Sequence, residues 1–230
     1  MTTKPFDALI FDLDGTLIDS VPDICASLNT VLTEIGCRKL TLEEIKEMVG
    51  WGGRVLVEKA LERTGHVGVE SDVEKVLENF LITYSKNPST YSRVFPGVLS
   101  ALERFKSIGI SMGICTNKPT MTTMPVLKAL QLDHFFDVVS CGDAVPYRKP
   151  DGRHILLVLE QLGVTKQTAA MIGDSEADIE AAIAAGVRSV AVTFGYSHKP
   201  CEDLGADVLI DNFDNLEQAL QSIAPPTILS

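Results

Sequence analysis

Near the start of the 230-residue chain stands the segment Ala8-Leu9-Ile10-Phe11-Asp12-Leu13-Asp14-Gly15-Thr16. Its first four residues are apolar, which is typical of a strand buried on both faces of a parallel sheet. The carboxylates of Asp12 and Asp14 follow, and their alternate positions place both on one side of the strand end. Gly15 permits a sharp exit that brings backbone N–H groups towards an anion. The segment therefore predicts a buried parallel strand that ends in an acidic loop.

Further short apolar segments repeat the first half of this pattern. They are 110–115, 138–140, 169–173, 187–193 and 207–210. Between them lie segments with helical spacing such as 99–108, and Pro119, Pro150 and Gly186 stand where helices would begin or end. This alternation predicts an α/β fold, a Rossmann-like core of three layers in which helices cover both faces of a parallel sheet.

The alternation is interrupted between about residues 19 and 87. One helical face carries the apolar residues Val21, Ile24, Leu28, Val31 and Ile35. Thr41 and Ser71 each open a possible capping box, and a further helical segment, 55–61, lies between them. Four helices in succession predict a helical module inserted after the first strand. We therefore expect a core of residues 1–16 and 90–230 and a helical insert of residues 17–89.

Composition limits the kinds of partner. The net charge of −11 and the isoelectric point of about 4.8 disfavour nucleic acids and anionic membranes. The start of the chain has no signal-peptide architecture, and no apolar run reaches the roughly 20 residues of a membrane helix, so we expect a cytoplasmic protein. Either a monomer or a homodimer is compatible with the sequence. An anionic substrate would need a local cationic site on this acidic chain.

The five cysteines include no C-x-x-C pair, and the four histidines are scattered. This pattern disfavours a zinc cluster and favours cysteines that serve as small buried hydrophobic residues.

Polar residues follow three more of the expected strands, at the edge where ligands bind to open parallel sheets. The segment Thr116-Asn117-Lys118-Pro119 offers a hydroxyl, an amide and an ammonium group, which suit a phosphate. Lys149 follows the next strand, and Asp174 and Asp178 share one face of the helix after 169–173. Each segment alone has an ordinary interpretation, as a helix cap, a solvated lysine or acidic residues at a helix N-terminus. Beside Asp12 and Asp14, however, the acidic pair predicts a hard cation, for which Mg²⁺ fits best.

The four segments occur in the order D-x-D-G-T, T-N, K-P and G-D-x-x-x-D. In this order the sequence resembles the haloacid dehalogenase superfamily of aspartate-nucleophile phosphatases, over nearly the whole chain. The resemblance implies that the helical insert is a small cap. It also implies an aspartyl-phosphate mechanism in which Asp12 is the nucleophile and Asp14 is the general acid and base. Because dehalogenases lack a second aspartate, Asp14 favours phosphate chemistry.

The same resemblance implies the remaining site. The transferring phosphoryl group would be held by Thr116, Asn117 and Lys149. Mg²⁺ would be held by Asp12, the backbone carbonyl of Asp14, Asp174 and Asp178.

A narrower resemblance is to bacterial phosphoglycolate phosphatases. It rests on the segments 116–119, 147–150, 193–196 and 49–54. It implies a small phosphorylated metabolite as substrate, 2-phosphoglycolate first among the candidates. Within 49–54, Trp51 and Arg54 are candidates for substrate specificity, with Arg54 pairing with a substrate carboxylate, and Lys118 is a second candidate for that contact. Gly152 departs from the proline that is common in the family, and we expect it to affect only the start of its helix.

Other functions remain open on the sequence. A nucleotide phosphatase, a sugar phosphatase, a pyrophosphatase or a phosphoglucomutase-like enzyme would share the four segments and differ in the cap. A phosphonatase would need a cap lysine, for which Lys59 is the candidate. A phosphate-accepting regulatory or binding module is a different class, and the helical insert disfavours it because a lid that excludes water suits hydrolysis.

Overall fold

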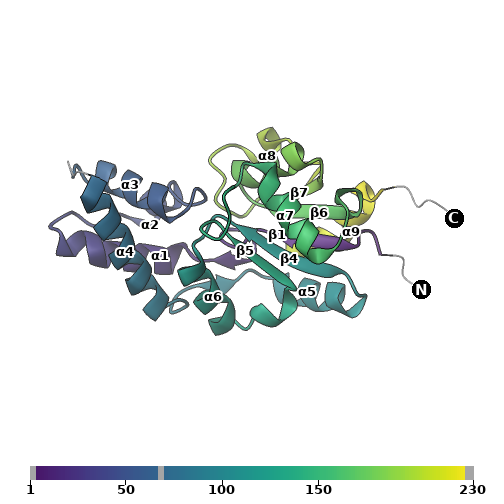
Figure 1. The fold of residues 1–230 in the computed structure, drawn as a ribbon, viewed down its shortest axis with the longest axis horizontal. Helices are drawn as coiled ribbons and strands as arrows, with labels where there is room; N and C mark the ends of the chain where they lie inside the picture. The colour runs from purple at the N-terminus through teal and green to yellow at the C-terminus, as the bar shows by residue number, and fades with distance from the viewer. Residues whose placement is uncertain (1–3, 67–69, 226–230) are drawn as a thin grey trace.

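A six-stranded parallel sheet fills one end of the molecule (Figure 1). The structure is a computed structural model in which residues 4–66 and 70–225 are described. The strands lie in the order β5-β4-β1-β6-β7-β8. They are β1 (Ala8–Phe11), β4 (Ser111–Thr116), β5 (Val138–Cys141), β6 (Ala169–Gly173), β7 (Arg188–Val192) and β8 (Val208–Ile210). All six strands predicted from the apolar segments are therefore confirmed, with ends that differ by at most two residues.

Helices cover both faces of this sheet (Figure 1). Ala8 and Ile10 of β1 pack among residues of α7 (Gly152–Leu162) and α8 (Glu176–Ala185). Leu9 and Phe11 point the other way, into a larger apolar cluster. That cluster includes side chains of α5 (Val98–Ser107), α6 (Thr120–Ala129) and α9 (Leu216–Ile223). The continuous apolar run of β1 is thus explained by burial on both faces, and the predicted three-layer α/β core is confirmed.

Most of the predicted helix ends are also found. Pro119 is the N-cap residue of α6, and Gly186 ends α8 in the left-handed conformation that favours glycine. The prediction that a helix begins at Pro150 is wrong by two residues. Asp151 is the N-cap of α7, because its side chain accepts a hydrogen bond from the backbone N–H of Arg153.

Four helices form the other end of the molecule (Figure 1). They are α1 (Val21–Glu34), α2 (Leu42–Lys46), α3 (Gly53–Arg63) and α4 (Glu70–Lys86). A short antiparallel pair, β2 (Ile18–Asp19) and β3 (Arg93–Val94), joins the chain where it leaves the core and where it returns. The capping box predicted at Ser71 does not open its helix, because α4 already includes Ser71. The residue boundaries of 17 and 89 for this helical module remain a prediction.

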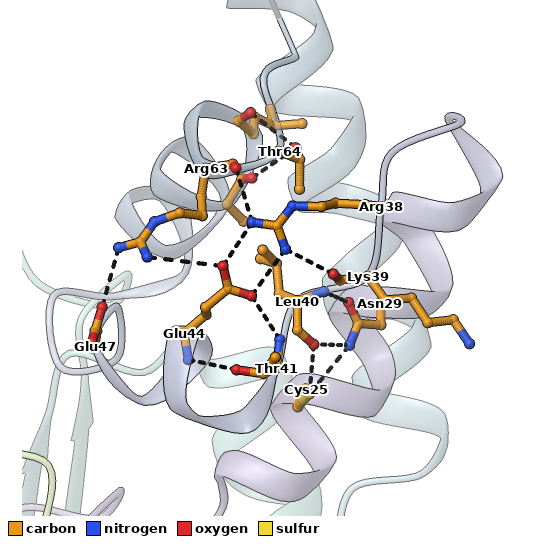
Figure 2. Close-up of polar contacts among 12 residues, drawn as sticks. Cys25, Asn29, Arg38, Lys39, Leu40, Thr41, Glu44, Glu47, Arg63 and Thr64 are labelled. Atoms are coloured by element: carbon orange, nitrogen blue, oxygen red, sulfur yellow. Dashed lines mark hydrogen bonds and ion pairs between the residues drawn. The ribbon is translucent and has the colours of Figure 1, made fainter.

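Polar contacts hold α2 against its neighbours (Figure 2). The capping box predicted at Thr41 is confirmed, since Thr41 accepts from the backbone N–H of Glu44 and Glu44 accepts from that of Thr41. Glu44 also pairs with Arg38, with 2.7 Å between Oε1 and Nη2, and lies 3.9 Å from Arg63. This ion pair, together with the hydrogen bond from Thr41, lowers the pKa of Glu44 to about 2. The first turn of α2 is thereby tied to the segments on both sides of it.

Short 3₁₀ turns complete the described chain. They are Asp133–Phe135, Lys166–Thr168, Cys201–Leu204 and Phe213–Asn215. The five cysteines are free thiols, of which Cys25, Cys115 and Cys141 are buried as the sequence predicts. Among the described residues, no helix combines the length and the apolarity of a membrane span.

Candidate active site

The order of the strands brings the four polar loops together. β1 lies at the centre of the sheet, between β4 and β6. All three strands run in the same direction, so their carboxyl ends meet at one edge. Asp12, Thr116 and Asp174 stand at these ends, and the loop after β5 brings Lys149 to the same edge. Side chains up to 166 residues apart in the sequence can therefore share one site.

Lys149 lies between two carboxylates at the centre of this edge. Its Nζ is 2.6 Å from Oδ1 of Asp12 and 2.5 Å from Oδ1 of Asp178. The Lys149 side chain is only 2% exposed. Burial would lower the pKa of Lys149, but the two carboxylates outweigh it and hold that pKa above its ordinary value. Lys149 is therefore a fixed positive charge beside Asp12.

Asp174 and Asp178 are held in place by hydrogen bonds from several loops. Asp174 accepts from the hydroxyl of Thr16 at 2.9 Å and from the backbone N–H of Tyr196 at 2.6 Å. Asp178 Oδ2 accepts from the hydroxyl and the backbone N–H of Ser175, at 2.7 and 3.0 Å. Both side chains are thus oriented before any ligand arrives.

Asp12, Asp174 and Asp178 form a buried acidic cluster. Each of the three carboxylates offers an oxygen, and these oxygens lie within 4.8 Å of one another. Burial and the neighbouring carboxylates raise the pKa of Asp12 to about 7, although the charge of Lys149 acts in the opposite direction. Burial and the charges of Asp178 and Asp12 raise the pKa of Asp174 well above its ordinary value. Lys149 balances only one of the three negative charges, so the donor set fits a hard divalent cation with oxygen ligands.

The side chain of Asp14 does not join the acidic cluster. It accepts hydrogen bonds from Lys118 Nζ at 2.9 and 3.0 Å and from the hydroxyl of Ser20 at 2.6 Å. Asp14 therefore faces away from Asp174 and Asp178, towards the helical module. The two carboxylates of the D-x-D segment have different partners, which suits two different chemical roles.

The loop after β4 contributes the other side of the site. Thr116 is buried, and its hydroxyl accepts from the backbone N–H of Lys118 at 3.1 Å. The side-chain amide of Asn117 donates to the carbonyl of Gly50 at 3.0 Å and to that of Lys149 at 2.9 Å. Both amide protons of Asn117 are therefore used. This side chain thereby links the two ends of the molecule, and its expected role in holding a phosphoryl group stays a prediction.

A cavity of about 40 Å³ lies between the catalytic edge and the helical module. Asp12, Asp14, Thr116, Asn117 and Lys118 line its polar end. Its other lining residues are Ile24, Val49, Gly50, Gly52, Gly53, Leu56, Phe80, Tyr84, Pro119 and Thr122. The space is small, since each buried water needs roughly 10–15 Å³ of such volume.

The structure places two of the three specificity candidates away from this cavity. Arg54 forms ion pairs with Glu58, at 3.3 Å, and with Glu74 on α4. The ring of Trp51 lies 6.3 Å from that of His198 in the core. Neither Trp51 nor Arg54 lines the cavity, and neither does Lys59. Lys118, the candidate with less support from the sequence, is the one that lies inside.

Several residues of the site were not among those predicted from the sequence. Tyr84 stands in α4 at apolar helical spacing, yet its hydroxyl accepts from Lys118 Nζ at 3.0 Å. Asp23 of α1 accepts from the backbone N–H groups of Tyr91 and Ser92, and so ties the module to its return segment. Thr16 and Tyr196 hold Asp174. Thr16 belongs to the D-x-D-G-T segment and Tyr196 to the segment 193–196, whereas no motif of the sequence includes Tyr84 or Asp23.

Comparison with known proteins places this fold and site in one family. Residues 9–192 match the model of the haloacid dehalogenase-like hydrolases. The chain belongs to that family.

Individual relatives carry a narrower name. The chain is 39% identical to a phosphoglycolate phosphatase of Agrobacterium fabrum over 221 residues, which cover 96% of this chain and 95% of the relative. It is 36% identical to phosphoglycolate phosphatase 1 of Pseudomonas aeruginosa, covering 96% and 84%. A crystal structure described as a predicted phosphoglycolate phosphatase from Haemophilus somnus superposes with a TM-score of 0.89 at 29% identity, covering 95% and 99%. The chain is an enzyme of the same class, a phosphoric monoester hydrolase.

Proposed function

We propose that the protein is a Mg²⁺-dependent phosphatase that hydrolyses 2-phosphoglycolate to glycolate and phosphate through an aspartyl-phosphate on Asp12. The observation that carries this proposal is the buried cluster of Asp12, Asp174 and Asp178, in which Lys149 binds Asp12 and Asp178 and Asp12 lines a cavity. The phosphoglycolate phosphatase names of the relatives support the substrate.

Asp12 would supply the nucleophilic oxygen. Its Oδ1 is bound to Lys149, which leaves Oδ2 to attack phosphorus and to displace the leaving oxygen. Lys149 and the hydroxyl of Thr116 would hold the oxygens of the transferring group, and Asn117 would contribute its backbone N–H. Phosphoryl transfer depends mainly on positioning and on charge neutralisation, and this buried loop edge supplies both.

Asp12, Asp174, Asp178 and the backbone carbonyl of Asp14 would hold Mg²⁺, with Asp178 acting directly or through water. When bound, the ion neutralises negative charge between the nucleophile and the phosphoryl oxygens. The donors of the cluster are all oxygens, the ligand type that Mg²⁺ prefers.

Asp14 would move the protons of the reaction. In its protonated form it would donate to the leaving oxygen of the ester, and as a carboxylate it would then accept a proton from the water that attacks the phospho-aspartate. Its hydrogen bonds from Ser20 and Lys118 fix its direction towards the cavity. A halide leaving group would need no such proton, so Asp14 favours phosphate chemistry over dehalogenation.

The leaving group would lie in the cavity between the catalytic edge and the helical module. The names of the relatives favour phosphoglycolate over the substrates of nucleotide and sugar phosphatases or of a phosphoglucomutase-like enzyme. We propose that residues 17–89 form the cap over the leaving group, because Ile24, Leu56 and Phe80 of its helices line the cavity. A phosphonatase is not favoured, since Lys59 lies outside the lining.

The test measures phosphate release from a panel of phosphorylated metabolites. One series contains about 5 mM Mg²⁺, roughly 10³ times a micromolar enzyme concentration, and a parallel series contains excess chelator. The expected result is Mg²⁺-dependent release with phosphoglycolate as the best substrate. Asp12→Asn should lower turnover by about 10³-fold or more without unfolding the protein, whereas Asp133→Asn at an exposed site should not. Release that survives Asp12→Asn would exclude this nucleophile, and a preference for pyrophosphate or a nucleotide would move the substrate elsewhere in the family.

A further inference from the structure

We propose that Lys118, supported by Tyr84, is the receptor for a carboxylate on the carbon that bears the phosphate ester. This inference rests on the proposed function and names the feature of the substrate that the cavity selects. It assigns the selection to the buried edge of the core rather than to Arg54 on α3.

Lys118 is a buried cation in the cavity wall. Its side chain is 4% exposed, and its Nζ lies 2.9 and 3.0 Å from the two oxygens of Asp14 and 3.0 Å from the hydroxyl of Tyr84. The carboxylate of Asp14 is paired with this ammonium group inside the protein, where an unpaired charge would be costly.

No other cationic side chain lines the cavity in the described part of the chain. Lys149 is not among the lining residues, and its ammonium group is shared between Asp12 and Asp178. Beyond Lys118 the wall is apolar, with Ile24, Leu56 and Phe80. A second anionic group of a ligand in this cavity would therefore be stable only beside Lys118, because an unpaired charge against apolar walls is costly.

The chemistry of the leaving group places a carboxylate at this point. Asp14 must reach the leaving oxygen in order to protonate it, and Lys118 Nζ lies one hydrogen bond beyond Asp14. In a 2-phospho acid, two covalent bonds separate the leaving oxygen from the carboxylate carbon, a distance of about 2.5 Å. A carboxylate on that carbon comes within hydrogen-bond reach of Nζ, whereas one on a longer chain would have to enter the apolar part of the cavity.

Tyr84 makes this receptor depend on the cap. It belongs to α4, it is almost fully buried, and its hydroxyl accepts a hydrogen bond from Lys118 Nζ. Burial raises the pKa of Tyr84 to about 12, so the phenol stays neutral and leaves the charge of Lys118 intact. Its own proton remains available to a ligand carboxylate. Tyr84 is a positioning residue, and Lys118 makes the direct contact.

The decisive experiment compares two substrates of the same length in Lys118→Gln and Lys118→Arg. They are phosphoglycolate and 2-hydroxyethyl phosphate, in which a hydroxymethyl group replaces the carboxylate. Both substrates should lose activity in Lys118→Gln, because Asp14 loses its partner. The ratio of their kcat/KM values should fall by a further 10- to 100-fold, roughly what a charged hydrogen bond provides, and Lys118→Arg should restore part of it. Equal losses on both substrates would mean that Lys118 only positions Asp14, and would overturn the proposal.

A failure of the proposed function would look different. Wild-type protein that releases phosphate from other metabolites but not from phosphoglycolate would refute the substrate before any variant is made. A ratio that stays unchanged in Lys118→Gln, with wild-type activity on phosphoglycolate intact, would refute only the role of Lys118.

A second measurement covers the case in which Lys118→Gln does not fold. Glycolate should inhibit the wild-type enzyme competitively, and glycolamide, which has the same shape without the charge, should inhibit at least about tenfold more weakly. Tyr84→Phe should weaken the glycolate inhibition by a few-fold and leave the inhibition by inorganic phosphate unchanged. Equal inhibition by glycolate and glycolamide would contradict a carboxylate receptor.

Discussion

At the scale of single residues, the site consists of buried charges that pair with one another. Lys149 donates hydrogen bonds to Asp12 and Asp178, and Lys118 donates to Asp14. Such pairs contribute little to stability, because desolvation offsets most of the attraction. Their value lies in fixing the orientation of each carboxylate at the site.

His154 is a buried titratable group beside this site. It is fully buried at the start of α7, and its Nε2 lies 2.9 Å from the hydroxyl of Ser140. Its Nδ1 has no hydrogen-bond partner among the described residues. Burial and the charge of Lys149 lower the pKa of His154 to about 4. The folded protein therefore keeps this imidazole neutral at pH values where the unfolded chain already binds a proton.

We expect the free energy of unfolding to fall as the pH drops from about 6.5 to about 4, because the unfolded state gains the proton of His154 first. Above pH 6.5 both states are neutral at this residue, and its contribution is constant. The loss reaches about 3 kcal/mol at pH 4. Urea unfolding at a series of pH values measures it.

The matched variants for this measurement are His154→Gln and His134→Gln, since His134 is exposed. His154→Gln should remove the contribution of His154 to the pH dependence of the unfolding free energy between pH 4 and 6.5, and His134→Gln should not change that dependence. The same slope in wild type and in His154→Gln would show that other groups carry the acid sensitivity.

At the scale of elements, the close contact between α7 and α8 depends on Gly152. A Cβ at this position would lie 2.5 Å from the backbone N of Ala185 and 2.8 Å from the carbonyl carbon of Ala184. Backbone atoms cannot yield as a flexible side chain can, so only glycine allows the two helices this approach. The expectation that Gly152 affects only the start of its helix is therefore wrong.

Gly152→Ala should destabilise the protein by about 1–3 kcal/mol, because the added methyl group overpacks the contact between the two helices. This is opposite to the effect of the same change at an unconstrained helix position. The control is Gln161→Ala at an exposed position of α7, which should stay within about 0.5 kcal/mol of wild type. Denaturant unfolding of both variants decides the matter, and an unchanged or higher stability for Gly152→Ala would mean that the helices can separate at no cost.

At the scale of the whole molecule, the core and the helical module share one apolar cluster, and hydrogen bonds between loops add to it. Asn117 of the core donates to the carbonyl of Gly50, and Nε2 of His198 lies 3.0 Å from the carbonyl of Glu47. The ring of Trp51 lies beside the ring of His198. The loop before α3 is thereby held over the cavity, and Trp51, the single tryptophan, reports on it.

We expect Asn117→Ala to loosen this loop, because Gly50 and Lys149 both lose a hydrogen bond from one amide. KM for small phosphoesters should rise by about three- to tenfold, the effect of one or two neutral hydrogen bonds. The fluorescence of Trp51 should shift to longer wavelength at the same time. Asn212→Ala, which removes a cap in a core loop, is the control. A rise in KM with unchanged Trp51 emission would point to a direct role of Asn117 in phosphate binding instead.

The sequence by itself determined the strands and the four acidic and basic loops. Short continuous apolar runs that alternate with helical segments favour strands buried on both faces, and parallel strands bring their carboxyl ends to one edge. Asp12, Lys149, Asp174 and Asp178 therefore meet as expected. The helical module was equally visible, because helical spacing and caps are local signals.

Only the tertiary structure decided which charged and polar side chains pair with one another. Lys118 binds Asp14, which is 104 residues away in the sequence, and Tyr84, which is 34 residues away. Arg54 instead forms ion pairs with Glu58 and Glu74. No local pattern distinguishes these two basic residues, because the difference lies in which surface the fold closes over. The amide of Asn117 and the contact of Gly152 with α8 have the same origin. Both contacts depend on how distant segments pack together, and the spacing of residues within one segment does not predict that packing.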